Sequence, residues 1–181
     1  MENRDIEGVI EGILFVSGEP VKISRIADVL KIPQGTIEKT ADAMIGKYSF
    51  ERRGIRLIKL DGALQLVSSP EYSEAIRSTL DTRPPQKLSP PALEVLATVA
   101  YFQPVTKAYI EQIRGVDSAY TVGILAERGL IEMCGRLDVP GRPMLYKTTN
   151  VFLRMFGLES LDDLPDLPDL PDLPEAAVKE D

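Results

Sequence analysis

The sequence contains no histidine, and Cys134 is its only cysteine. A chain without histidine has no histidine metal ligand, general base or catalytic triad. A single cysteine cannot form an internal disulfide, which is typical of proteins in a reducing cytosol. No apolar run approaches the roughly 20 residues of a membrane helix, and the N-terminus is too charged for a signal peptide. We therefore expect a soluble cytoplasmic protein with no catalytic residues, cofactor, metal or membrane contact.

Negative charge is concentrated at one end of the chain. The formal charge is -7, yet residues 159–181 hold nine acidic residues and one basic residue, so residues 1–158 are close to neutral. This end carries repeated Asp-Leu-Pro triplets, and repeated proline excludes helix and sheet. We expect residues 159–181 to form a disordered acidic tail that solvates the protein. In a polyproline II conformation, with three residues per turn, its leucines would instead line one edge as a docking strip: Leu164, Leu167, Leu170 and Leu173.

Three helices are predicted at the start of the chain. Apolar residues recur at helical spacing from Ile6 to Leu14, and Ser17-Gly18 can end this helix. Ser24 is a candidate N-cap for a short second helix. A third helix, over about residues 34–48, again has one apolar face.

The hydrophobic period then changes from helical to two. Ile55–Leu60 and Ala63–Val67 alternate as strands do, and Asp61-Gly62 between them is typical of a two-residue type I′ turn. Three helices followed by a hairpin is the order of a winged-helix domain. One more helix is expected over Glu71–Leu80, with Pro70 at its first position.

The same order begins again in the second half. Ser89 and Thr106 are candidate N-caps for two helices, a third covers Ser118–Arg128, and strands are expected at Leu130–Cys134 and Met144–Thr148. A last helix is expected near residues 150–156. Glu19-Pro20-Val21 resembles Gln103-Pro104-Val105, and at the same offset of 84 Ile26 corresponds to Ile110. We infer a tandem repeat.

The resulting fold class is mainly α with small β-hairpins (α+β), with two tandem winged-helix domains and a disordered acidic C-terminal tail. We expect the first domain at residues 1–82, a linker at 83–90, the second domain at 91–158 and the tail at 159–181.

The first hairpin suggests self-association. Ile55 and Leu57 project to one face and Ile58 and Leu60 to the other, so burial on one side cannot hide them all. We expect a dimer interface formed by apolar residues of this hairpin: Ile55, Leu57, Ile58, Leu60, Leu64 and Leu66. Alternatively, the helix over Glu71–Leu80 folds back and covers the second face.

DNA reading and catalysis find little support in the residues. The start of the predicted third helix of the second half, Ser118–Gly123, has no Arg, Lys, Asn or Gln to contact base edges. A winged-helix DNA-binding transcriptional regulator is therefore only the alternative hypothesis, and we expect DNA binding to be at most weak and non-specific. Cys134 is predicted to be a small core residue. The glycines of Gly135–Gly141 match no phosphate-binding motif.

Several segments resemble the bacterial segregation and condensation protein B family. The resemblance is most specific in the glycine, arginine and proline loop Gly135–Tyr146. It is looser in the first half, from Ile13-Leu14-Phe15 to Gly18–Val21. The remaining segments that carry it are Leu93–Ala97, Tyr101–Lys107, Ile110 to Val116, Glu127–Ile131, Phe152–Leu158 and Ser160–Pro165.

The resemblance implies a role that periodicity alone does not give. Members of that family are homodimers of two winged-helix domains that associate through the first. They bind the kleisin subunit, segregation and condensation protein A (ScpA), which bridges the heads of the structural maintenance of chromosomes (SMC) ATPase. The complex condenses and partitions the chromosome at cell division. This implies a non-catalytic accessory subunit in the cytoplasm, associated with the nucleoid.

For the kleisin contact, aromatic residues of the second domain are the candidates, because interfaces are enriched in aromatics: Tyr101, Phe102, Tyr109 and Tyr120. Each could equally belong to the core. Arg136 and Arg142 either hold the second wing in place, through Asp138 and backbone carbonyls, or offer a charged contact to the kleisin.

Overall fold

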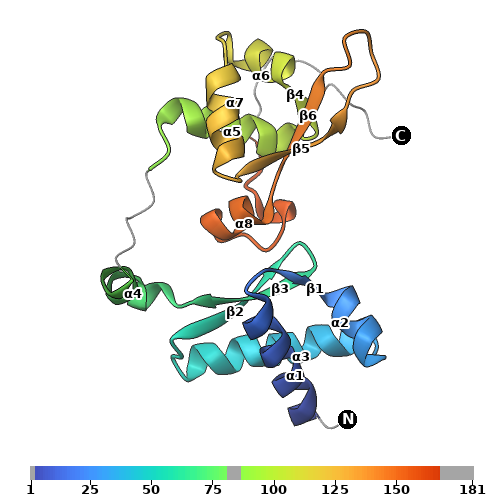
Figure 1. Ribbon diagram of the computed structural model, residues 1–181, viewed down its shortest axis with the longest axis vertical. Coiled ribbons are helices and arrows are strands. Elements are labelled where there is room, and N and C mark those ends of the chain that lie inside the picture. Colours follow the sequence, from blue (N-terminus) through green and yellow to red (C-terminus); the bar gives the residue numbers. More distant parts are fainter. Residues whose placement is uncertain (1–2, 81–86, 168–181) are drawn as a thin grey trace. The chain divides into compact units, whose positions relative to one another are not determined.

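The computed structural model describes residues 3–80 and 87–167. The chain divides into two compact units, residues 1–85 and 86–181 (Figure 1). Each combines helices with a small antiparallel sheet, so the predicted mixture of helices and hairpins is confirmed. Residues 83–86 of the predicted linker at 83–90 are outside the described ranges, and Pro90 at its other end is the first residue of a helix.

The first unit has the order helix, short strand, two helices, hairpin and two short helices. Its elements are α1 (Asn3–Ser17), β1 (Val21–Lys22), α2 (Ile23–Leu30), α3 (Gln34–Phe50), β2 (Ile55–Leu60), β3 (Ala63–Ser68), the 3₁₀ helix η1 (Pro70–Tyr72) and α4 (Ser73–Thr79).

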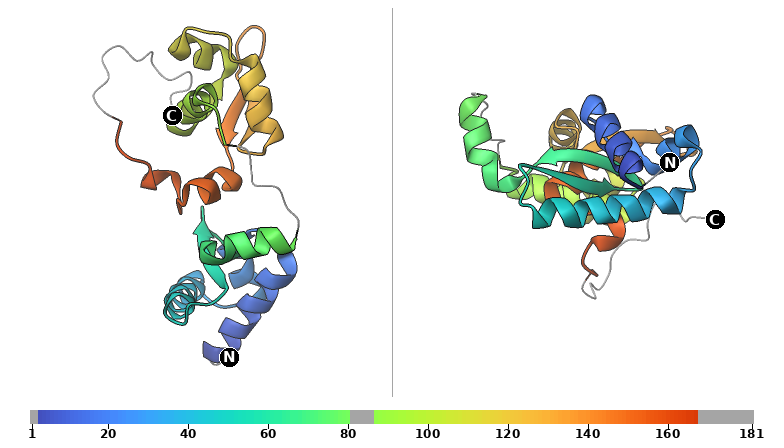
Figure 2. Two further views of the ribbon diagram at one scale, coloured as in Figure 1. Left: turned by 90° about the vertical axis from the view of Figure 1, so that its left-hand side faces the viewer. Right: turned by 90° about the horizontal axis from the view of Figure 1, so that it is seen from below.

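The core of this unit forms where the apolar stripes of α1 and α3 meet the hairpin. Ile6, Ile10 and Leu14 recur on one side of α1, as the spacing predicts, and all three are buried. Figure 2 shows α3 running along the hairpin. Leu57 and Leu64 of the hairpin complete the same cluster.

The second unit repeats this order. Its elements are α5 (Pro90–Phe102), β4 (Val105–Thr106), α6 (Lys107–Arg114), α7 (Ala119–Glu127), β5 (Ile131–Arg136), β6 (Met144–Thr148), α8 (Asn150–Phe156) and the 3₁₀ helix η2 (Leu161–Asp163).

The internal repeat is confirmed by both element positions and strand order. Adding 84 to the bounds of β1 and α2 gives those of β4 and α6. The sheet order is β1-β3-β2 in one unit and β4-β6-β5 in the other, so the second strand of each hairpin is central in both. Ile26 and the corresponding Ile110 are both buried.

Two predicted details at helix starts are wrong. Ser24 does not cap α2, because the helix begins one residue earlier and its Ile23 N–H donates to the Gly62 carbonyl at 2.9 Å. The hairpin turn therefore satisfies the helix start that a serine side chain would otherwise serve. The segment after Ser69 begins as the 3₁₀ helix η1, and α4 starts only at Ser73.

The prediction of disorder from residue 159 onward is also wrong for the start of the tail. Ser160 and Asp163 form a capping box around η2: the Ser160 hydroxyl accepts the Asp162 N–H at 3.1 Å, and an Asp163 oxygen accepts the Ser160 N–H at 3.0 Å. Two backbone donors are thus satisfied locally despite the high acidic content. Residues 168–181 lie outside the described ranges.

Candidate protein-interaction surfaces

The first hairpin has its side chains on the expected faces, but most of them are buried. Leu57 lies opposite Leu66, and Ile58 opposite Gln65, in an unbroken register. Ile55 and Leu57 therefore share one face and Ile58 and Leu60 the other, as predicted. The exposed fraction is 2% for Leu57, 1% for Leu60 and 0% for Leu64. The prediction that these three contribute to an exposed interface is wrong. Each of them fills protein interior.

Three of the six predicted interface residues keep some exposure. Ile58 and Leu66 are half-buried, and Leu66 packs against the core of the unit. Ile55 is exposed. The alternative, a helix folded back over the hairpin, finds no support, because α4 buries none of its residues. Figures 1 and 2 show α4 lying away from the turn of the hairpin.

An exposed apolar surface does exist beside the hairpin, at the corner where α3 leads into β2. Phe50 is 90% exposed, and Ile55 and Tyr72 are exposed as well. The Tyr72 hydroxyl donates to the Arg52 carbonyl at 3.5 Å, which places the tyrosine against the turn that joins Phe50 to Ile55. We call Phe50, Ile55 and Tyr72 the corner patch. The pattern of the hairpin does not include Phe50. In the sequence, however, Phe50 lies off the apolar face of its helix, which indicates that its side chain is exposed.

A second exposed apolar spot lies at the end of α1. Phe15 is 79% and Val16 is 84% exposed, whereas Leu14 beside them is buried. Their positions follow from helical geometry, since Phe15 and Val16 point about 100° and 200° away from Leu14 around the helix. Contiguous exposed apolar patches often mark protein contacts, whereas isolated exposed apolar side chains are common.

Next to the corner patch, Tyr48 is a polar member of the first unit's core. Its ring is buried, and the Arg53 guanidinium carbon lies 4.4 Å from the ring centroid. Among the described residues its hydroxyl has no hydrogen-bond partner. Burial, and then the negative charge of Glu11, raise the pKa of Tyr48, while Arg53 acts in the opposite direction. This environment favours the neutral phenol.

The aromatic residues proposed for the kleisin contact lie in different environments. Tyr109 is only 5% exposed, and its ring meets Phe102 edge-on with centroids 5.8 Å apart. Burial raises the pKa of Tyr109. A direct surface contact by Tyr109 is therefore a wrong prediction. Tyr101 is half-buried and donates its hydroxyl to the Pro165 carbonyl at 2.8 Å. Tyr120 is the exposed member of the set, at 81%.

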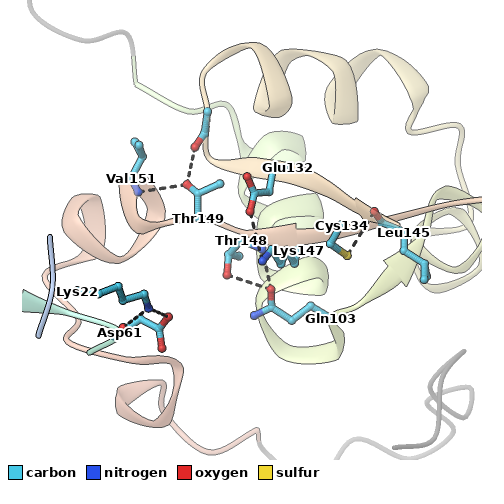
Figure 3. A network of polar contacts seen from close by, with 11 residues as sticks. Lys22, Asp61, Gln103, Glu132, Cys134, Leu145, Lys147, Thr148, Thr149 and Val151 are labelled. Atoms are coloured by element: carbon cyan, nitrogen blue, oxygen red, sulfur yellow. Dashed lines mark hydrogen bonds and ion pairs between the residues drawn. The ribbon is translucent and has the colours of Figure 1, made fainter. Parts of the chain in front are cut away.

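The second hairpin, β5–β6, is held to its helices at the base. Figure 3 shows Gln103, just after α5, accepting from the Thr148 N–H at 2.6 Å and from its hydroxyl at 3.0 Å. Thr149 donates to the Gly129 carbonyl at 2.5 Å and accepts from the Val151 N–H, capping α8. Glu132 and Lys147 pair across the strands. These contacts fix the base of the hairpin against α5 and α8.

The loop of this hairpin, residues 137–143, is held by its own backbone. Arg136 donates to the Arg142 carbonyl at 3.0 Å, and the Leu137 N–H donates to the Pro143 carbonyl at 2.9 Å. Gly141 has a φ of 90°, which favours glycine. The predicted contact of Arg136 with a backbone carbonyl is confirmed, whereas neither arginine pairs with Asp138 among the described residues. Both arginine side chains are exposed, so a charged contact stays open to them.

Cys134 is exposed, which corrects its prediction as a core residue. It lies at an irregularity of the β5–β6 register, between Met133 and Gly135. Since β5 is an edge strand and the extra residue of a bulge leaves the regular alternation, apolar neighbours in sequence do not imply burial here.

The exposed side of α7, the helix that would read DNA in a winged-helix protein, carries no cation. Its exposed residues are Ala119, Tyr120, Gly123, Ala126 and Glu127. In the first unit, Gln34 of α3 donates to Glu38, and Lys47 pairs with Glu7. Base readout needs free hydrogen-bonding side chains at these positions.

The described ranges also hold no helix that could cross a bilayer, and no group of three or more Cys, Asp or Glu placed as metal ligands would be.

The family model described as segregation and condensation complex subunit ScpB matches residues 8–167, which include nearly all described residues of both units. The chain belongs to the segregation and condensation protein B family. The segregation and condensation protein B of Clostridium acetobutylicum is 44% identical over 155 residues, covering 86% of this chain and 77% of that protein.

Solved structures of the family are also similar to this chain. ScpB from Mycobacterium tuberculosis is 28% identical and covers 87% of this chain and 98% of its own, with a TM-score of 0.44. A dimer of an ScpB N-terminal domain complexed with a ScpA peptide is 23% identical, and covers 42% of this chain and 95% of that one, with a TM-score of 0.40. Membership of the segregation and condensation protein B family rests on the sequence matches.

Proposed function

We propose that this protein is a non-catalytic subunit of the bacterial SMC–kleisin complex, a homodimer that binds ScpA and takes part in chromosome condensation and segregation at cell division. The observation that carries the proposal is the family match over residues 8–167. The SMC ATPase is then reached through the kleisin. Such a subunit acts in the cytoplasm, at the nucleoid, and contacts DNA weakly and without sequence preference.

We interpret both units as winged-helix domains, with the boundaries 1–82 and 91–158 given by the sequence. Two facts support this interpretation: each unit has three helices before its hairpin, and each sheet gains a third, two-residue strand between the first two helices. In this interpretation the hairpins are the wings. A winged-helix transcription regulator has no comparable support, because α7 exposes no Arg, Lys, Asn or Gln for base readout.

For the homodimer we propose the corner patch as the contact of the first unit. It keeps Ile55 from the predicted interface and replaces the buried leucines by Phe50 and Tyr72. Aromatic residues dominate binding energy in many interfaces, and Phe50 is 90% exposed. For ScpA we propose Tyr120 as a contact, since it is the most exposed of the candidate aromatics.

The test is size-exclusion chromatography with light scattering, on the protein alone and mixed with ScpA. A chain of 20.0 kDa is expected to elute at the mass of a dimer and to co-elute with ScpA. A persistent monomer that never co-elutes with ScpA would contradict the proposal. We expect deletion of residues 166–181 to leave both properties intact.

Surface variants locate the two contacts. Phe50→Asp is expected to give monomers, whereas Phe15→Asp, at the other exposed apolar spot, is the matched control and keeps the dimer. The reverse result would move the dimer contact to the end of α1. Tyr120→Asp is expected to weaken ScpA binding by at least tenfold while the dimer persists. Unchanged ScpA affinity would remove Tyr120 from the contact.

A further inference from the structure

The tip of the second hairpin combines exposed apolar and cationic side chains. Met133, Val139 and Met144 are 57%, 43% and 41% exposed. Arg136 and Arg142 lie among them on the same strand ends and loop. We call these five residues the wing tip. In a single small unit, apolar side chains of this size with arginines between them form a surface suited to an acidic, leucine-containing chain.

The two arginines of the wing tip differ from other cations of the same unit. Lys107, Arg114 and Lys147 pair with carboxylates of their own unit at 3.0 to 3.5 Å. Among the described residues, Arg136 and Arg142 have no acidic partner, and the bond that Arg136 makes is to a carbonyl. Their charges are therefore available to carboxylates from elsewhere in the chain.

The acidic end of the chain begins close to the base of this hairpin. After α8, the capping box of η2 keeps the chain ordered, and the Tyr101 hydroxyl then binds the Pro165 carbonyl. Tyr101 is two residues from Gln103, which binds Thr148 at the end of β6. Pro165 is thus attached to the part of α5 that holds the hairpin.

The remaining chain is long enough to reach the wing tip. From Thr148 to Met144, β6 rises by about 13 Å, at roughly 3.3 Å per residue. The segment from Leu167 to Pro174 spans about 22 Å in a polyproline II conformation, at roughly 3.1 Å per residue. In that conformation the leucines and the aspartates of the triplets lie on separate edges.

We propose that the Asp-Leu-Pro segment of this chain, residues 166–174, docks on the wing tip of its own second unit. The leucine edge contacts Met133, Val139 and Met144, and the aspartates face Arg136 and Arg142. Polyproline II segments bind with a small loss of conformational entropy, because they are extended before binding. Any other anionic partner of the wing tip then has to displace this segment. The inference rests on the second unit alone and does not require ScpA binding.

The chain itself offers a probe, because Cys134 is its only cysteine, is exposed and lies on β5 beside Met133. In the full-length Pro171→Cys variant, oxidation with diamide at low protein concentration forms a disulfide with Cys134. Mass spectrometry gives its rate, and non-reducing electrophoresis separates the intramolecular from the intermolecular product. We expect the intramolecular product, formed about threefold faster at low than at high salt, since the pairs are exposed.

Charge reversal at the wing tip provides the decisive comparison. Arg142→Glu leaves the backbone carbonyl that holds Arg136 and is expected to slow the disulfide about threefold at low salt. The matched control Lys87→Glu changes the charge equally on an exposed residue away from the wing tip and leaves the rate unchanged. Adding Asp169→Arg to Arg142→Glu is expected to restore it. The proposal would be overturned if the rate of disulfide formation did not depend on Arg142 and salt, or if Lys87→Glu had an equal effect. It would also be overturned if the charge swap gave no recovery, or if the product were purely intermolecular.

Discussion

The two hairpins follow the third helix of their units in the same way, yet the β2–β3 hairpin is largely buried and the β5–β6 hairpin is largely exposed. In β2 and β3, five residues are buried: Leu57, Leu60, Ala63, Leu64 and Gln65. In β5 and β6, Ile131 is the one buried residue among those described. Strand order is the same in both sheets. The order of elements therefore does not decide whether a hairpin stabilises the fold or presents a surface.

The connections explain part of this difference. β2 and β3 are joined by Asp61-Gly62, both at positive φ, and Lys22 binds the carbonyl and the carboxylate of Asp61. A two-residue turn keeps the whole hairpin within reach of the core. β5 and β6 are joined by residues 137–143, and the register is irregular between Met133 and Gly135. The longer hairpin extends beyond the helices, so its side chains contact solvent or a partner.

The largest expected difference in the free energy of unfolding is between substitutions of Leu64 and of Met144. Leu64 is fully buried in the core of the first unit, and Leu64→Ala is expected to lower the free energy of unfolding by about 2–5 kcal/mol. Met144→Ala, on the second hairpin and exposed, should change it by less than about 0.5 kcal/mol. Urea unfolding of the full chain followed by circular dichroism measures both. Similar losses would show that the second hairpin is also part of a core.

The next largest effect on stability is expected from replacing a glycine in the hairpin turns. Gly62 has a φ of 68°, and Gly62→Ala is expected to cost about 1–2 kcal/mol, because the methyl group clashes with the backbone there. This strain is expected to lower the global stability, since the turn also binds the start of α2 through Ile23. Gly141→Ala introduces strain in an exposed loop, and we expect it to change loop hydrogen exchange without shifting the urea midpoint. A midpoint shift as large as that of Gly62→Ala would contradict the comparison.

Much of the fold could be predicted from residue pattern alone. Asp61-Gly62 indicated the turn, and Met144–Thr148 and residues 150–156 are the observed β6 and α8. The short strands β1 and β4 were missed, because two residues carry no periodicity. They form only by pairing with Leu64 and Tyr146, which are distant in sequence. Local preference cannot report such pairing.

The candidate surfaces were harder to predict than the fold. Alternation assigned Leu57 and Leu60 to opposite faces, but it could not show that both faces are buried there. Cys134 was predicted to be a core residue, but it is exposed because its strand lies at the edge of the sheet. Exposure depends on which elements cover a strand, and that is a property of tertiary packing. Phe50, in contrast, could have been found from its position off the helical stripe.

The helix that follows the short strand begins differently in the two units, and the expected difference in stability is smaller. In the second unit the Thr106 hydroxyl accepts the Tyr109 N–H at 3.2 Å, and Thr106→Ala is expected to cost about 1 kcal/mol. In the first unit the backbone of Gly62 serves α2, so Ser24→Ala should be neutral within about 0.5 kcal/mol. Both are measured as shifts of the urea midpoint. A loss in Ser24→Ala equal to that in Thr106→Ala would mean that the serine contributes to capping in solution.

The buried tyrosines give the smallest effect, which appears only in alkali. Burial raises the pKa of both Tyr48 and Tyr109 above the ordinary value of 10.0, and the carboxylate of Glu11 raises that of Tyr48 further. The folded state then holds the phenol proton more tightly than the unfolded state does. Stability is complete below the unfolded pKa and is lost as the pH rises through the folded one.

Tyr48→Phe is therefore expected to remove part of the stability loss above pH 10, as is Tyr109→Phe. At neutral pH it should be close to neutral or slightly stabilising, because the hydroxyl of Tyr48 has no hydrogen-bond partner among the described residues. Urea midpoints measured between neutral pH and alkali give the slopes. If Tyr48→Phe and the unmodified chain lose stability in parallel, ionisation of Tyr48 does not limit the first unit, and the pH sensitivity of its core lies elsewhere.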